Sequence, residues 1–389
     1  MTDVKTQVSR LLTEGVEEVI VRENLERRLL SGERLRIKLG IDPTSPHIHI
    51  GRAVALWKLK AFQEMGHQVV FIVGDFTGLI GDTSDKDSER PMLTEDQASA
   101  NMKTYFEQAY KILDRDKTEA HYNSAWLKNL GFAEIGKMAN LFGLHEFAAR
   151  ENIKRRLDAG KRVSLRELLY PLMQGYDSVA VKADVELGGT DQRFNLLAGR
   201  TIQPLYGQAA QDIMTTELLE GTDGRKMSSS AGNVINITDE PNDMFGKVMA
   251  TRDDLIPRYA RLAAGMTEEE IAALAGKPAI EAKEDVAFAL TAHYHGPERA
   301  ASARSFFERT FRRREAAAEG AAAVSFQKGE ELFAILARAK EAPSKSEWRR
   351  LISQSAVEFE GNVVSDAKFV PPHGGVVKVG KKKFFKLEE

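Results

Sequence analysis

Hydrophobic residues recur at two different periods along the first half of the chain. Over residues 8–20 they stand three or four positions apart, and this spacing predicts one leading helix across the first thirty residues. Residues 34–40 alternate between polar and apolar side chains, as a strand does. Two prolines in the following loop prevent regular structure until a helix can begin near Ile48. A run of β-branched and aromatic residues over 69–73 predicts the next strand.

The same alternation continues beyond that strand. An amphipathic segment begins at about Glu95, and helical stretches run over 129–156 and 165–181. Residues 184–187 and a turn over 188–190 then precede a helix from about Asp191. Strands that alternate with helices predict a parallel sheet with right-handed crossovers, which is an α/β fold of the Rossmann-like type. In such sheets ligands bind at the carboxyl ends of the strands, where the loops lie.

The second half of the chain has a different character. A polar loop over 224–230 leads into an almost wholly helical region, and the last sixty residues form a small mixed unit. A chain of 389 residues is long enough for two or three domains. We expect an α/β domain over 1–222 with a helical insert at about 125–165, a loop and α-helical domain over 223–325, and a small α+β domain over 330–389.

Composition narrows the classes of protein to which the chain can belong. Hydrophobic residues make up 42% and charged residues 29% of the sequence, a balance typical of a globular protein. The absence of cysteine excludes disulfides, zinc–thiolate sites and thiol catalysis, and we expect no structural metal. No signal-peptide pattern opens the chain, and no stretch approaches the ~18 apolar residues of a membrane span, so we expect a cytoplasmic protein without a membrane partner. The net charge of -2 leaves any contact with nucleic acid to local basic patches.

Two separated motifs carry candidate chemistry for phosphate binding. His49-Ile50-Gly51-Arg52 stands at the start of a predicted helix, where free backbone N–H groups and the helix dipole favour an anion. Alone, this tetrapeptide fits a capped helix with a solvated histidine and arginine equally well. Together with Lys226-Met227-Ser228-Ser229-Ser230, it resembles the HIGH and KMSKS signatures of the class I aminoacyl-tRNA synthetases. Arg52 replaces the second histidine, and Ser229 replaces the second lysine. We therefore expect Lys226 to stabilise more of the charge that develops in the transition state.

Residues between these motifs resemble the tyrosine-specific branch of that family. Tyr170, Gln174 and Asp177 stand four and three positions apart, so they share one face of a helix. The resemblance assigns Tyr170 and Gln174, with Asp82, to the α-ammonium group of the substrate, and Asp177 to its phenolic hydroxyl. Lys38 stands where the family often has a tyrosine near that hydroxyl. If Lys38 pairs with Asp177, the carboxylate stays ionised and remains a strong acceptor.

The turn Gly188-Gly189-Thr190-Asp191-Gln192 resembles the GG[S/T]DQ turn of the same branch, although alone it would fit a β-turn before a helix cap. The resemblance places Asp191 at the ribose and Gln192 near the tyrosyl carboxylate, and it implies ATP with Mg²⁺. The implied ATP-binding residues are Gly40, Asp42, His49, Gly51, Arg52, Gly189, Asp191, Lys226 and Ser229. The implied catalytic donors are Thr44, His49, Arg52, Lys86, Arg90 and Lys226, although Lys86 and Arg90 also fit a solvated charge run.

The C-terminal segment from about Phe333 resembles an S4 RNA-binding domain. Residues 346–352 would form its basic helix, and a lysine cluster stands beside two phenylalanines near the C-terminus. Basic tails are often only solubilising, but lysines beside aromatic rings suit contacts with RNA backbone and bases. The family also implies a homodimer, with the helical insert around 129–156 as the expected interface. The residues expected to bind tRNA are Arg349, Arg350, Lys381, Lys382 and Lys383.

The resemblance covers nearly the whole chain and implies a tyrosine–tRNA ligase reaction. Tyrosine and ATP would give tyrosyl-adenylate and pyrophosphate, and the tyrosyl group would then pass to the 3′ end of tRNA(Tyr). Two alternatives stay open. The tryptophan-specific branch shares the sheet and both signatures, and a non-catalytic RNA-binding paralogue would be favoured by the departures at Arg52 and Ser229.

Overall fold

The computed structural model describes residues 4–82, 92–319, 322–339, 341–360, 362–380 and 383–388. It divides into two compact units, Met1–Ala303 and Arg304–Glu389. The larger unit contains a six-stranded sheet in the order β1-β6-β5-β2-β3-β4. Neighbouring strands are parallel except for β1, which pairs antiparallel with β6. The strands are β1 (Val16–Ile20), β2 (Arg36–Ile41), β3 (Gln68–Val73), β4 (Thr118–Tyr122), β5 (Val185–Gly189) and β6 (Asp212–Thr216).

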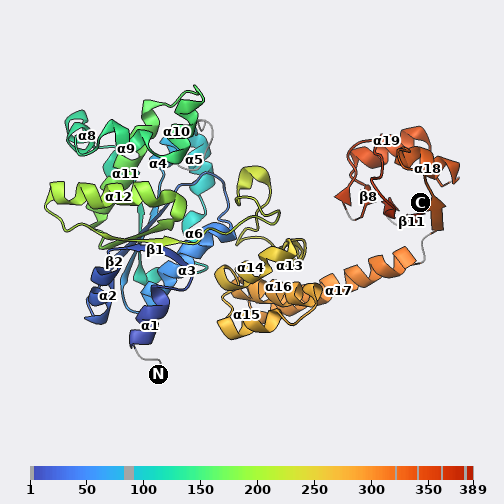
Figure 1. Ribbon diagram of the computed structural model, residues 1–389, viewed down its shortest axis with the longest axis horizontal. Coiled ribbons are helices and arrows are strands. Elements are labelled where there is room, and N and C mark those ends of the chain that lie inside the picture. Colours follow the sequence, from blue (N-terminus) through green and yellow to red (C-terminus); the bar gives the residue numbers. More distant parts are fainter. Residues whose placement is uncertain are drawn as a thin grey trace. The chain divides into compact units, whose positions relative to one another are not determined.

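Helices cover both faces of this sheet, as the predicted Rossmann-like α/β fold requires. In Figure 1, α11 and α12 lie on one side of the sheet and α1, α2 and α3 on the other. Both faces of the central strands are therefore buried, which explains the unbroken apolar run of β3. The helices before the long C-terminal region are α1 (Val4–Leu11), α2 (Arg22–Leu30), α3 (Ile50–Glu64), α4 (Thr77–Ile80), α5 (Glu95–Met102), α6 (Tyr105–Ala109), α7 (Ser124–Leu127), α8 (Phe132–Ala139), α9 (Leu144–Ala148), α10 (Glu151–Asp158), α11 (Leu165–Val181) and α12 (Arg193–Ile202).

The order of the strands places a ligand site between β2 and β5. From β2 the chain continues to β3 on one side, and it returns on the other side as β5 and β6. The loops after β2 and β5 therefore leave the sheet in different directions and open a crevice between them. In open parallel sheets this is the place where ligands bind.

The helix α11 forms as predicted over residues 165–181. Ser164 caps its first turn, and the Glu167 side chain completes a capping box with the Ser164 backbone. The buried Glu167 carboxylate also accepts from Arg156 on α10 at 2.5 Å. This ion pair ties the helical insert to the helix that carries three of the predicted substrate contacts.

The prediction of one leading helix is wrong, whereas the predicted helical stretch of the insert is confirmed as helical but is divided. The leading helix ends at Leu11, and Gly15, at φ +63°, turns the chain into β1. The apolar residues of β1 fit a helical period locally, but pairing with the distant strand β6 decides their structure. The stretch 129–156 is three short helices, α8 to α10, because glycines at 131 and 143 stand at the starts of α8 and α9. The strands β4 and β6 were not predicted.

The region after the polar loop is helical, as predicted. Its helices are α13 (Pro241–Met249), α14 (Ile256–Leu262), α15 (Glu268–Leu274), α16 (Ala279–His295) and α17 (Pro297–Glu319). Trp57 on α3 donates to the Tyr294 hydroxyl on α16 at 3.1 Å, so this region packs directly on the α/β part. The predicted division between an α/β domain and a helical domain near residue 222 stays a prediction.

The C-terminal unit is a small α+β structure with its own core. Its sheet has the order β7-β11-β10-β8-β9, and Trp348 lies in the core that the sheet shares with both helices. Its elements are β7 (Ala322–Ser325), α18 (Leu332–Arg338), α19 (Lys345–Ser353), β8 (Val357–Phe359), β9 (Asn362–Val363), β10 (Gly375–Val379) and β11 (Lys383–Glu388). Among the helices that the structure describes in either unit, none has the length and apolar character to cross a membrane.

Candidate active site

A cavity of about 530 Å³ opens at the carboxyl ends of β2, β5 and β6. It collects residues from both signature motifs, from the α11 face and from the turn after β5. Their proximity follows from the strand order, although the roles assigned to them stay predictions. The predicted site residues that line the cavity are Gly40, Asp42, Thr44, His49, Gly51, Arg52, Asp82, Tyr170, Gln174, Asp177, Gly189, Asp191, Gln192, Lys226 and Ser229.

Asp42 joins the loop after β2 to two other elements. Its Oδ1 accepts from the Thr77 hydroxyl at 2.7 Å, and its Oδ2 accepts from the Tyr170 hydroxyl at 2.8 Å. Burial raises the pKa of the Asp42 carboxyl to about 6, although both hydrogen bonds oppose that rise. Burial and the neighbouring carboxyls also raise the pKa of the Tyr170 phenol. Tyr170 therefore presents a neutral hydroxyl whose proton points at Asp42, and its oxygen can still accept.

His49 caps α3 and presents a hydrogen-bond donor to the cavity. Its Nδ1 accepts from the backbone N–H of Arg52 at 3.3 Å. Burial, with the charges of Arg52 and Lys226, lowers the pKa of His49 to about 3, so the ring is neutral. A neutral ring that accepts at Nδ1 carries its proton on Nε2. The side chain therefore offers an N–H to an anion at the start of α3.

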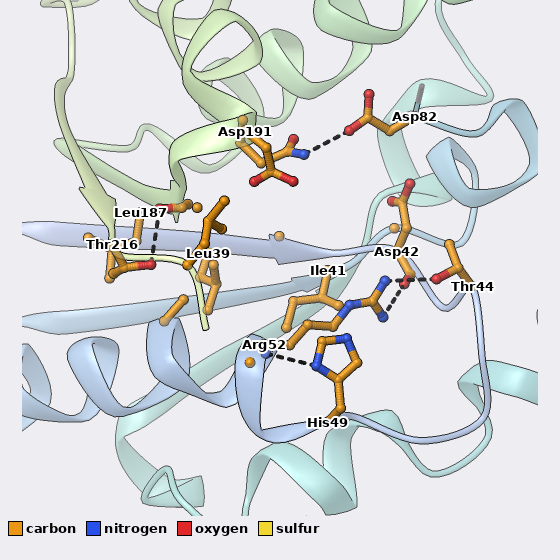
Figure 2. Close-up of a pocket in the computed structure, with 18 of the residues that line it drawn as sticks. Leu39, Ile41, Asp42, Thr44, His49, Arg52, Asp82, Leu187, Asp191 and Thr216 are labelled. Atoms are coloured by element: carbon orange, nitrogen blue, oxygen red, sulfur yellow. Dashed lines mark hydrogen bonds between the residues drawn. The ribbon is translucent and has the colours of Figure 1, made fainter. Parts of the chain in front are cut away.

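Arg52 holds the loop after β2, as Figure 2 shows. Its guanidinium donates to the Asp42 carbonyl at 3.2 Å, to the Tyr105 hydroxyl at 3.2 Å and to Thr44 Oγ1 at 2.7 Å. Because Thr44 Oγ1 accepts from Arg52, its own proton remains available for another acceptor. The residue that departs from the usual motif thus orients its neighbours as well as supplying positive charge.

The far side of the cavity is formed by the turn after β5 and by the polar loop. Lys226 Nζ donates to Asp191 Oδ2 at 2.8 Å, and both side chains are partly exposed. Gln192 Nε2 donates to Asp82 Oδ2 at 2.7 Å (Figure 2). Ser229 Oγ donates to Ser45 Oγ at 3.2 Å, so the polar loop is joined to the loop after β2. The two residues predicted for ribose and phosphates, Asp191 and Lys226, are thus paired with each other.

Asp177 lies buried at the α11 wall of the cavity. Its Oδ1 accepts from the Trp126 indole N–H at 2.7 Å, and its Oδ2 accepts from the Asn123 amide at 3.2 Å. Burial raises the pKa of Asp177 to about 7, against the opposing effects of the Lys38 charge and of both hydrogen bonds. The carboxyl therefore changes its charge near neutral pH.

Lys38 does not lie where the sequence analysis placed it. Its Nζ pairs with Glu186 Oε1 at 2.8 Å, and this pair replaces the expected one with Asp177. The side chain is fully buried behind α11 and does not line the cavity. The reason is the register of the sheet, in which Lys38 stands directly beside Glu186. Lys38 can therefore act on the cavity through the residues that it contacts and through the effect of its charge on Asp177.

Several site residues were missed by sequence reasoning. Thr77, Asn123 and Arg258 line the cavity, while Trp126 and Glu186 act on residues that do. Asn123 follows β4 directly, so a correct prediction of that strand would have pointed to it. The others carry no local signal, because they reach the site through tertiary contacts.

Some predicted residues belong elsewhere. Lys86, Arg90, Lys381 and Lys382 lie outside the described residues. Arg349, Arg350 and Lys383 belong to the C-terminal unit, and Arg350 is tied to Glu347 at 2.5 Å. Within the described ranges, no group of three or more histidine, aspartate or glutamate residues is arranged to hold a metal ion.

Comparisons with known proteins show the family to which this chain belongs. Residues 30–312 match the family described as tRNA synthetases class I (W and Y). The tyrosine–tRNA ligase of Thermotoga maritima is 42% identical over 387 residues, covering 97% of this chain and 96% of that protein. The tyrosine–tRNA ligase of Dehalococcoides mccartyi is 41% identical over 395 residues, covering 99% of this chain and 100% of that protein.

Solved structures share the fold. The tyrosyl-tRNA synthetase from Archaeoglobus fulgidus, complexed with L-tyrosine, superimposes with a TM-score of 0.62 at 23% identity, covering 78% of this chain and 100% of that chain. The tryptophanyl-tRNA synthetase from Aeropyrum pernix K1 gives a TM-score of 0.56 at 18% identity, covering 73% of this chain and 83% of that chain. Because the family model matches residues 30–312, the chain belongs to the class I tRNA synthetases of the W and Y family. Its relatives, similar over nearly their whole length, place it among the tyrosine–tRNA ligases.

The packing around Asp42 generates a test of how the site is built. A methyl group at Gly74 would lie 2.1 Å from Asp42 Oδ1 and 2.3 Å from Thr77 Oγ1, two atoms that bond each other. We expect Gly74→Ala to lower the free energy of unfolding by about 1–3 kcal/mol. The matched control is Gly40→Ala, because a methyl group at this cavity-lining position meets nothing within 4 Å. Urea denaturation followed by tryptophan fluorescence compares the two, and equal effects would contradict this account of Gly74.

Proposed function

We propose that this chain activates L-tyrosine with ATP in the cavity at β2 and β5 and then transfers the tyrosyl group to tRNA(Tyr). The observation that carries the proposal is the position of Asp177. This buried acceptor lies on the α11 wall of a cavity whose other walls carry donors suited to phosphates. A buried acceptor at that wall fits a substrate side chain that ends in a hydroxyl. A purely apolar side chain would leave this acceptor without a hydrogen bond, which costs free energy.

The first step needs positioning and charge stabilisation and no side-chain nucleophile. A carboxylate oxygen of tyrosine attacks the α-phosphorus of ATP, the new P–O bond forms, and the bond to the departing pyrophosphate breaks. The His49 N–H, the Thr44 hydroxyl and the Lys226 ammonium stabilise the charge that builds on the phosphate oxygens. Arg52 contributes by holding Thr44 with its proton free. Lys86 and Arg90 are proposed to reach the pyrophosphate.

The ends of the cavity bind the two parts of the adenylate. Asp191 is proposed to accept from the ribose hydroxyls, with Gly40, Gly51 and Gly189 leaving room for the nucleotide, and Ser229 lies at the mouth. Gln174, Tyr170 and Asp82 are proposed to receive the α-ammonium group, and Gln192 lies near the tyrosyl carboxylate. Mg²⁺ is proposed to enter on the phosphates of ATP, its usual partners at nucleotide sites.

The C-terminal unit is proposed to be an S4 RNA-binding domain that contacts the tRNA through Arg349, Arg350 and Lys381–Lys383. Its independent core and exposed basic residues support this role. We also propose a cytoplasmic homodimer. Its interface would lie on the insert, where Phe132 on α8 is 93% exposed and Leu144 on α9 is 70% exposed. Side chains of this size are usually covered by a partner surface when they cluster.

Lys226→Ala should slow tyrosine-dependent ATP–pyrophosphate exchange by roughly 100-fold, because its contact strengthens only as charge develops on the phosphates. Tyrosine binding, measured by equilibrium dialysis, should stay nearly unchanged. The control is Arg225→Ala, which removes an exposed cation that is bonded to Asp223 and does not line the cavity. Equal losses in exchange rate and tyrosine affinity would rule out this role for Lys226.

Asp177→Asn should lower the preference for tyrosine over phenylalanine roughly 10- to 100-fold, since the charged acceptor for the phenolic hydroxyl is lost. In the unchanged protein, KM for tyrosine should fall as pH rises from about 6 to about 8, because a carboxyl with a pKa of about 7 becomes ionised over this range. The variant should lack that part of the slope. Asp42 titrates in both proteins, so its contribution to the pH dependence of KM cancels when the two are compared.

Exchange kinetics with tyrosine, phenylalanine and tryptophan provide the measurement. Asp191→Asn is the matched control on the nucleotide side of the cavity, and it should raise KM for ATP while leaving the ratio of tyrosine to phenylalanine unchanged. An undiminished tyrosine preference in Asp177→Asn would move the specificity elsewhere. Absence of tyrosine-dependent exchange in the unchanged protein would contradict the proposed function itself.

A protein that ends at Glu319 should keep tyrosine-dependent exchange within about threefold, because the cavity belongs wholly to the larger unit. Charging of tRNA should fall far more, since the proposed RNA contacts are deleted. Aminoacylation with labelled tyrosine measures the second activity. Full charging by a folded truncated protein would show that the C-terminal unit is no tRNA-binding module.

A further inference from the structure

A buried ion pair lies directly behind the substrate-facing helix α11. Lys38 on β2 and Glu186 on β5 are neighbours in the parallel register, and their side chains are 0% and 1% exposed. Lys38 Nζ lies 2.8 Å from Glu186 Oε1. An ion pair this deep costs much desolvation free energy and contributes little to stability unless every polar atom is satisfied. The partners of the pair therefore decide what it can do behind this helix.

The pair is nearly saturated with hydrogen bonds, and most of them come from α11. Lys38 Nζ also donates to the Gln174 carbonyl at 2.9 Å and to Ser178 Oγ at 2.8 Å. The Glu186 carboxylate accepts from Gln174 Nε2 at 3.1 Å, from Ser178 Oγ at 3.0 Å and from Gln211 Nε2 at 2.5 Å. Gln174 is therefore held at both its backbone and its side chain, and it is the member of this network that lines the cavity.

The chemistry of Glu186 decides which atom Gln174 can offer to a ligand. A carboxylate only accepts hydrogen bonds, so the Gln174 amide must present Nε2 to it. The carbonyl oxygen Oε1 is then the atom left for a ligand. The opposite orientation would place an oxygen against the carboxylate and turn an N–H₂ group toward the ligand. The first orientation attracts a cationic ligand, whereas the second repels it.

We propose that Glu186, neutralised by Lys38, is a positioning residue that fixes the Gln174 amide so that its carbonyl oxygen recognises the α-ammonium group of the amino acid. The inference rests on the proposed function, because it takes the amino acid to bind at α11. Lys38 supplies the counter-charge, so that Glu186 itself adds no net negative charge behind the site. The pair thus selects the ammonium group, while Asp177 reads the opposite end of the substrate.

The test uses two probes that differ only in the ammonium group. Tyramine has a phenol and an ammonium, and 4-ethylphenol has the phenol alone. Both are measured as competitive inhibitors of tyrosine-dependent exchange by the full chain. Glu186→Gln can accept or donate toward Gln174, so it no longer enforces one orientation of the amide. The inhibition constant of tyramine should rise about 10- to 30-fold, as expected for loss of a hydrogen bond to a charged group, and that of 4-ethylphenol should stay within about twofold. KM for tyrosine should rise more than kcat falls.

Ser178→Ala is the matched control. It removes one hydrogen bond from each member of the pair and keeps the bond from Gln174 to Glu186, so both inhibition constants should change by less than about threefold. If the pair has a merely structural role, Glu186→Gln should weaken the binding of both inhibitors together, and that result would overturn the proposal. So would an unchanged constant for tyramine.

A second variant covers the case in which Glu186→Gln does not fold because Lys38 is left buried without a counter-ion. Lys38→Met with Glu186→Met removes both charges at similar volume, a replacement that buried ion pairs often tolerate. It also removes the acceptor that orients Gln174, so the same selective loss of tyramine binding is expected. If the unchanged protein shows no tyrosine-dependent exchange, the proposed function fails. If it shows exchange and both variants bind tyramine normally, only the role of Glu186 fails.

Discussion

The parallel pairing of β2 with β5 is the contact on which the rest of the structure depends. These strands are far apart in the sequence, yet the strand order makes them the junction between the two halves of the sheet. Their backbone hydrogen bonds bring the loop after Ile41 beside the turn after Gly189, so one wall of the cavity comes from each half. A slip of one residue in this register would turn every side chain of one strand to the other face and separate Lys38 from Glu186.

The cavity is built from polar groups that are costly to bury. Asp42 and Asp177 both bind their protons more tightly in the folded chain than in an unfolded one, so their contribution to stability falls as pH rises through about 6 and about 7. Hydrogen bonds from Thr77, Tyr170, Trp126 and Asn123 offset part of that cost. Burying these carboxyls lowers the stability of the fold, but the same hydrogen bonds hold them as oriented acceptors in the cavity.

Much of the fold and part of the site could be predicted from the sequence. The helix over 165–181 was predicted with its correct bounds, and the structure shows a capping box at its start. The strands β1, β4 and β6 were missed. Their sequences mix polar and apolar residues without a clear strand pattern, and pairing with distant strands decides their structure. Motif residues gathered in one cavity as expected. The partner of Lys38 was predicted wrongly because strand register cannot be read from local sequence, and Glu186 was overlooked for the same reason.

The bond between Lys226 and Asp191 bears on which anions the cavity would accept. The two groups largely cancel each other's charge at the mouth, and a partly exposed pair of this kind costs little to open. An inorganic phosphate that drew Lys226 away would leave the Asp191 carboxylate without that cation. In the proposed binding mode, a nucleotide would offer phosphates to Lys226 and ribose hydroxyls to Asp191 together. Small anions would then face a penalty that a ligand with both parts avoids.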